Sequence, residues 1–228
     1  MSFRAKLYIA VILAIGFALV AYACANWKCT GLPRHLAYIV AASLAALMRI
    51  RIPGLAATYS LASLYVLLAI SFCSYSEIIG IGVLSTLVQC CIRTGSRPKA
   101  LPVLFSIASI VITISIAHYP SYFLASSSYK TLMPLGLAIS SGIYYVIDTT
   151  LLTGWDTLVK GSCFTETWDK WLLWAFGYHL LGAAIAVILS VDPLAIDWRM
   201  PLPVLPLAFV TYYYYREYLR RHVHQNLP

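Results

Sequence analysis

Charged residues are scarce in this chain. Asp, Glu, Lys and Arg together make up 11% of the 228 residues, and only 8 residues are acidic. The sequence also lacks any long hydrophilic stretch, which excludes a soluble domain with an ordinary charged surface. What it has instead is 61% hydrophobic residues, with 17 Tyr and 6 Trp. This composition is typical of integral membrane proteins.

Motifs of the common enzyme and metal classes are also missing. The chain has no Gly-rich phosphate loop, nucleophile elbow, paired-histidine motif or carboxylate cluster. Its 6 cysteines do not follow a metal-binding spacing. We therefore expect no enzyme activity, no cofactor and no metal site. One interpretation is that two of Cys24, Cys29 and Cys73 form a disulfide, and the alternative is that all three are small apolar residues within helices.

Eight apolar segments follow one another along the chain. They are residues 7–25, 35–48, 57–73, 77–92, 101–118, 131–153, 171–191 and 201–215. A helix that crosses a membrane needs about 20 residues, so the second and fourth segments are short for a complete crossing. The sequence predicts an all-α, polytopic transmembrane helix bundle with six to eight spans. Residues 1–215 would form the integral membrane domain and residues 216–228 a short basic cytoplasmic tail.

The distribution of basic residues predicts the orientation. If all eight segments cross and the N-terminus is inside, four of the 16 Lys and Arg residues lie outside, namely Lys28, Arg34, Lys130 and Arg199. The other twelve lie inside, which favours two cytoplasmic termini and, in a bacterium, the inner membrane. Membrane lipids are the expected surroundings. Because the basic residues are spread through short gaps, no nucleic-acid partner is expected.

Two polar stretches interrupt the hydrophobic pattern. After the Pro53-Gly54 break, we expect a helix to resume with Thr58 and Ser60 near its start, where hydroxyls can satisfy free amides or bind a ligand. An ordinary loop before a capped helix is the alternative. Both residues are candidate ligand-binding residues.

The segment SYSEIIGIG, residues 74–82, has the features of a helix start. Ser74 or Ser76 is placed to cap the helix, and Glu77 in the first turn faces the positive end of the helix dipole. The two glycines of this segment allow close packing of helices. Gln89 is the last polar residue of the same apolar segment. Glu77 and Gln89 are further candidate ligand-binding residues.

Ionisable side chains inside apolar segments cost several kcal/mol unless they are partnered, so they are candidates for function. Asp148 lies within the sixth segment beside Thr149, and His179 lies in the middle of the seventh. A ligand or proton site is one interpretation of Asp148; a hydrogen-bonded carboxyl that locks two helices is the other. For His179 the choice is between a ligand-binding role and a helix contact. We expect Asp148, Thr149 and His179 to belong to a ligand site.

Several stretches resemble a known family. They are RIRIPGLAATYSLASLYVLLAI, SYSEIIGIGVLSTLVQC, YYVIDTTLLTG and YYYYREYLRRH. They are similar to the N-terminal membrane sensor domain of bacterial, acidobacterial-type signalling proteins. In that family a multi-helix region precedes cytoplasmic GAF, GGDEF or HD-GYP domains that make or degrade cyclic di-GMP. The architecture is also distantly similar to the substrate-binding subunits of energy-coupling-factor vitamin transporters.

The resemblance implies polar or small residues at the candidate positions and also at Ser106, with asparagine more usual at position 148. Because six residues follow His222, we expect the output to come from a separate protein partner. The expected function is a stand-alone sensor that binds a small ligand or senses membrane state. A transporter subunit would need an outward-opening polar cavity, a sensor would need a cavity coupled to the last helix, and a scaffold would have no cavity.

Overall fold

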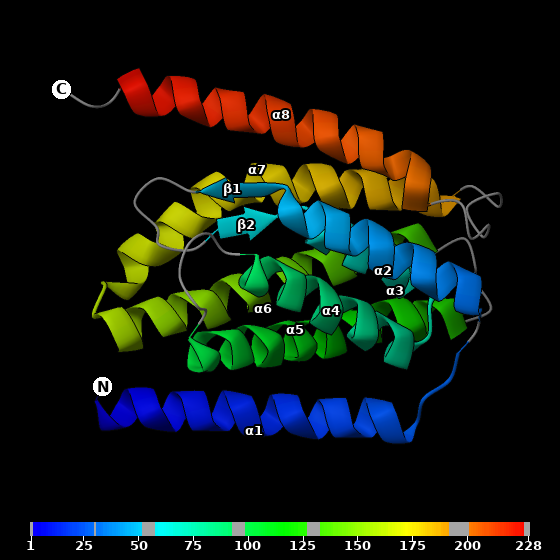
Figure 1. Ribbon diagram of the computed structural model, residues 1–228, viewed down its shortest axis with the longest axis horizontal. Helices are drawn as coiled ribbons and strands as arrows, with labels where there is room; N and C mark the ends of the chain where they lie inside the picture. The colour runs from blue at the N-terminus through cyan, green and yellow to red at the C-terminus, as the bar shows by residue number, and fades with distance from the viewer. Residues whose placement is uncertain are drawn as a thin grey trace.

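The computed structural model of the chain is a bundle of helices with one short strand pair (Figure 1). It describes residues 2–29, 31–51, 58–92, 99–126, 133–191 and 201–225. The helices are α1 (Phe3–Ala25), α2 (Leu32–Leu47), α3 (Ala62–Phe72), α4 (Tyr75–Cys91), α5 (Ala100–Ser126), α6 (Met133–Lys160), α7 (Phe164–Val191) and α8 (Pro201–Gln225). The strands β1 (Arg49–Arg51) and β2 (Thr58–Ser60) pair antiparallel. Each predicted apolar segment overlaps one of these helices, so the helical architecture is confirmed.

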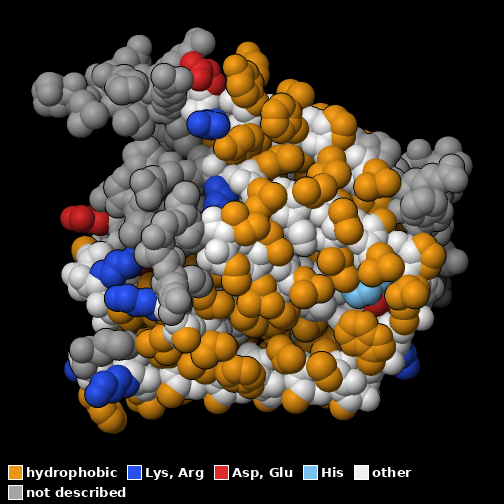
Figure 2. Space-filling model, in the orientation of Figure 1, with side chains coloured by type: hydrophobic (Ala, Val, Ile, Leu, Met, Phe, Trp, Pro, Cys, Tyr) orange, Lys and Arg blue, Asp and Glu red, His pale blue; other side chains and the backbone are white. Residues whose placement is uncertain are grey.

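Among the described residues, three helices are long and apolar enough to cross a membrane. They are α1, residues Ala100–Leu124 of α5 and residues Pro134–Lys160 of α6, whereas α2, α3 and α4 are shorter apolar helices. Hydrophobic side chains cover much of the face shown in Figure 2, as expected for a surface that meets lipid. The prediction of a membrane protein is thus confirmed at the level of helix length and composition.

The region after Pro53-Gly54 differs from the prediction. Thr58 and Ser60 lie in strand β2 and not in a resumed helix, and α3 begins only at Ala62. The physical reason is that Pro and Gly interrupt the helix while the β-branched and aromatic residues on either side favour an extended backbone. Strand β2 therefore takes the place of the first turn of the helix expected in the apolar segment 57–73.

Helix α3 is the centre of the bundle. It packs against α2, α4, α5, α6 and α7. Its side chains are buried on all sides, and Leu64, Tyr65 and Leu67 are each at most 1% exposed. A helix that is hydrophobic around its whole circumference is expected to be surrounded by other elements. The short α3 with the strand pair at its N-terminal end thus fixes the interior of the molecule.

The two ends of the bundle differ. Figure 1 shows the start of α1 and the end of α8 at the same end, where the β1–β2 pair also lies. Lys and Arg side chains gather mainly toward that end of the face shown in Figure 2. Helix α8 continues to Gln225, so the predicted tail is helical up to that residue. We call this end of the bundle the terminal end.

Candidate functional site

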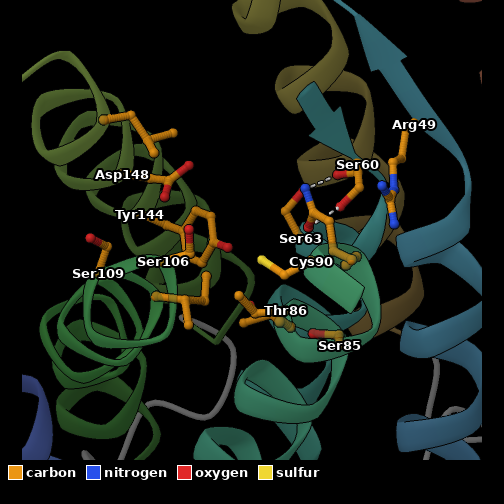
Figure 3. Close-up of a pocket in the computed structure, with 15 residues that line it drawn as sticks. Arg49, Ser60, Ser63, Ser85, Thr86, Cys90, Ser106, Ser109, Tyr144 and Asp148 are labelled. Carbon is orange, nitrogen blue, oxygen red and sulfur yellow. Dashed lines mark hydrogen bonds between the residues drawn. The ribbon is translucent and has the colours of Figure 1, made fainter. Parts of the chain in front are cut away.

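A polar cavity of about 180 Å³ lies among β1, β2, α3, α4, α5 and α6 (Figure 3). It is positioned toward the terminal end, because the strand pair and the last turns of α4 form part of its wall. Seven of its 15 lining residues carry a hydroxyl group, and the lining also holds one basic and one acidic group. The lining residues are Arg49, Ser60, Ala62, Ser63, Val66, Ser85, Thr86, Gln89, Cys90, Ser106, Ser109, Ile110, Tyr144, Asp148 and Leu152.

Each helix contributes a strip of side chains at helical spacing. Ser85, Thr86, Gln89 and Cys90 lie on one face of α4, because residues three and four apart are neighbours on a helix. Helix α6 contributes residues at positions 144, 148 and 152 in the same way. The cavity therefore forms where the polar strips of several helices meet around the first turn of α3.

One wall of the cavity carries the basic group. The Arg49 guanidinium donates from Nε to the Ala46 carbonyl at 3.3 Å and from Nη2 to the Val88 carbonyl at 3.4 Å. These two bonds hold the guanidinium near the C-terminal ends of α2 and α4, where the helix dipoles favour a cation. A guanidinium has five N–H donors, so donors remain for a ligand. Beside it, Ser60 Oγ donates to Gln89 Oε1 at 3.0 Å.

The other wall carries the acidic group. Figure 3 shows Asp148 and Tyr144 across the cavity from Arg49 and Ser60. Among the described residues, Lys160 and Asp156 form an ion pair, and Asp148 does not take part in one. Ser109 lines the same cavity; its Oγ is buried and has no hydrogen-bond partner in the described part of the chain. The cavity thus has a basic side chain on one wall and an acidic side chain on the opposite wall.

His179 lies next to the cavity and does not line it. Its Nε2 is 2.9 Å from the Ser141 carbonyl, which can only accept, so Nε2 carries the proton. The imidazole stacks on the Tyr144 ring with 5.7 Å between centroids and lies 5.0 Å from the Tyr145 ring. His179 is therefore a contact between α6 and α7, with Tyr144 placed between it and the cavity.

Glu77 is part of the cap of α4. The Ser74 backbone N–H donates to Glu77 Oε2 at 2.8 Å, and the Glu77 N–H donates to Ser74 Oγ at 3.4 Å. This capping box confirms the predicted helix start and assigns the cap to Ser74. Glu77 lies twelve residues before Gln89, or about 18 Å along the helix. It is fully buried at the opposite end of α4 from the cavity.

The structure thus brings together part of the predicted site. Asp148, Ser60 and Gln89 line one cavity, as does Ser106. Thr149 is buried on a neighbouring face of α6 and does not line it, and neither do Glu77 and His179. Thr58 lies in β2, and its side chain is outside the described residues. The polar cavity residues that were not among the candidates are Arg49, Ser63, Ser85, Thr86, Cys90, Ser109 and Tyr144.

One signal in the sequence was available for the missed residues of α4. Ser85, Thr86, Gln89 and Cys90 form a polar stripe at spacings of one, three and four, which is the pattern of one helix face.

The six cysteines are all free, so the disulfide left open for Cys24, Cys29 and Cys73 is not formed.

Comparison of the chain with protein-family models, with curated proteins and with solved structures finds no match.

Proposed function

We propose that the chain is a multi-pass inner-membrane sensor that binds a small molecule in the polar cavity and transmits its occupancy through α8. The observation that carries this proposal is the position of α8 relative to the cavity wall. Helix α8 contacts β1, the strand that begins with the cavity residue Arg49. Helix α8 also packs against α2, and the Ala46 carbonyl near the end of α2 accepts a hydrogen bond from Arg49.

These two connections provide a physical path for coupling. A ligand that draws the two walls of the cavity together moves β1 relative to α6, and β1 and α2 both contact α8. A ligand shifts a conformational equilibrium only when it contacts the two states differently. A ligand that bridges the two walls would favour the state in which they lie closer together, and β1 would pass that change to α8. The partner that receives the signal would bind the terminal end.

The orientation supports a sensor over a transporter subunit. We propose that both termini are cytoplasmic and that the helices form six to eight spans, in accord with the excess of basic residues at the terminal end. The cavity then lies toward the cytoplasmic side. A subunit that captures substrate from outside would need its cavity at the opposite end. A scaffold without a ligand gives no reason for a cavity lined by so many hydroxyl groups.

Native mass spectrometry of the purified protein tests the proposal. We expect a bound small molecule in the wild type and its loss in Asp148→Asn, which removes the acidic group from the cavity wall. Asp156→Asn is the matched control, because it makes the same change on α6 outside the cavity. The proposal fails if no small molecule is found and a stoichiometric protein partner is found instead, or if the molecule is retained equally in Asp148→Asn.

The orientation is tested by labelling single cysteines. Cys163 is exposed at the terminal end before α7, and Cys29 is exposed at the other end after α1. A hydrogen bond with the Thr165 hydroxyl and the N–H groups of Thr165 and Glu166 lower the pKa of Cys163, so more of it is thiolate at neutral pH. In intact spheroplasts we expect an impermeant maleimide to label Cys29 and to reach Cys163 only after permeabilisation. Labelling of Cys163 from outside would reverse the orientation.

A further inference from the structure

We propose that the cavity binds a small ω-amino acid, with its carboxylate at Arg49 and its ammonium group at Asp148. This inference rests on the proposed ligand-binding function and adds the chemical class of the ligand. It depends on three properties of the cavity: an anion-binding wall, a cation-binding wall opposite to it, and a volume suited to a short chain between them.

The anion-binding wall combines a cation, a helix start and hydroxyl groups. Arg49 keeps N–H donors beyond those bonded to Ala46 and Val88. The first turn of α3 also lines the cavity through Ala62 and Ser63. The first N–H groups of a helix have no acceptor within it, and the positive end of its dipole favours an anion. A carboxylate placed here would receive bonds from a guanidinium and from backbone groups together.

The cation-binding wall combines a carboxylate and an aromatic ring. Asp148 has no ion-pair partner among the described residues, and Tyr144 lies one turn before it on the same face of α6. A cation near a tyrosine ring is attracted by its π-electrons. The buried Ser109 hydroxyl has no hydrogen-bond partner among the residues that the structure describes, and it supplies an acceptor for an ammonium group at the same cavity.

The charges are complementary to a zwitterion. A charged side chain in an apolar bundle is costly unless it meets an opposite charge. Arg49 and Asp148 line one cavity from opposite walls and do not pair with each other. A purely anionic ligand would leave Asp148 without a cationic partner, and a purely cationic ligand would leave Arg49 without an anionic partner. A molecule with one charge at each end compensates both.

The volume limits the length of the ligand. An apolar cavity of about 150 Å³ holds benzene, which has six heavy atoms. By the same ratio, the cavity of about 180 Å³ suits a ligand of about seven heavy atoms. Figure 3 shows the charged groups on opposite walls, so the ligand charges must be separated by a chain. An α-amino acid carries both charges on one carbon and does not reach both walls.

Binding of 4-aminobutanoate and three matched probes tests the proposal directly. Butanoate lacks the ammonium group, butylamine lacks the carboxylate, and 2-aminobutanoate has the same atoms with adjacent charges. Displacement of radiolabelled 4-aminobutanoate from the purified wild-type protein is measured for each probe. We expect 4-aminobutanoate to bind at least about tenfold more tightly than each of the others, because each charge-assisted bond contributes about 1.5–3 kcal/mol. Equal affinities for all four would overturn the proposal, and this comparison needs no variant.

Two variants then test which wall binds which charge. Asp148→Asn should weaken the binding of 4-aminobutanoate and strengthen the binding of butanoate, because only the anion-binding wall keeps its charged group. Arg49→Gln should weaken 4-aminobutanoate and strengthen butylamine. A reciprocal change of preference cannot result from misfolding, which lowers all affinities together. Unchanged preferences in both variants would overturn the assignment. If native mass spectrometry still shows a molecule that is lost in Asp148→Asn, the proposed function stands and only the ligand class fails.

Discussion

Gly16→Leu is expected to displace α1 from the bundle and to lower the free energy of unfolding by about 3 kcal/mol, the upper part of the usual range for overpacked interiors. A Cβ atom at Gly16 would lie 2.5 Å from Cβ and 2.6 Å from Cα of Ala108 in α5. The second of these atoms belongs to the backbone, which cannot rotate out of the way. Any side chain at this position must therefore push α1 and α5 apart, and α1 packs mainly along α5.

Gly142→Leu is the matched control for this experiment. Gly142 lies in α6, is exposed, and a Cβ atom there would meet no atom within 4 Å. Both substitutions replace a helical glycine by a good helix former, so the change in helix propensity is the same. Titration of the purified proteins from mild detergent into SDS gives the free energy of unfolding. Similar values for the two variants would show that α1 and α5 do not make this close contact.

The contrast between these glycines shows what the sequence could predict about packing. Small residues in membrane helices favour close approach, and this predicted the role of Gly82, whose Cβ atom would lie 2.4 Å from Cδ1 of Ile114. The same rule does not distinguish Gly16 from Gly142. The direction in which a helix presents a given residue depends on the partner helices, and a single sequence does not contain that information.

The site was predictable to a similar extent. Asp148 and Gln89 were candidates because they are polar residues in apolar segments, and Ser60 because it follows the Pro53-Gly54 break; all three line the cavity. Glu77 was a candidate because it lies in the first turn of a capped helix, and its carboxylate serves the cap of α4. Arg49 was missed because a basic residue between two apolar segments is already explained by membrane topology. Its place in the cavity depends on the strand pair, which the helical pattern did not predict.

Leu67→Ala is expected to lower the free energy of unfolding by about 2–5 kcal/mol, the range for leucine truncation in a packed interior. Leu67 is 1% exposed and lies in α3, which is surrounded by five other helices. In a membrane, association of helices depends on packing contacts more than on removal of apolar surface from water. A void in the central helix removes contacts with several partners at once, and α3 has only 11 residues over which to distribute the loss.

Leu135→Ala on α6 is the control for Leu67→Ala, because Leu135 is 52% exposed and lies on the outer surface. We expect its cost to be about 0.5 kcal/mol or less, as for other substitutions outside the packed interior. Both variants are measured by the same SDS titration. Since the first turn of α3 lines the cavity, Leu67→Ala should also weaken binding of 4-aminobutanoate, whereas Leu135→Ala should leave it unchanged. Equal costs for the two leucines would mean that α3 is not the interior element on which the cavity is built.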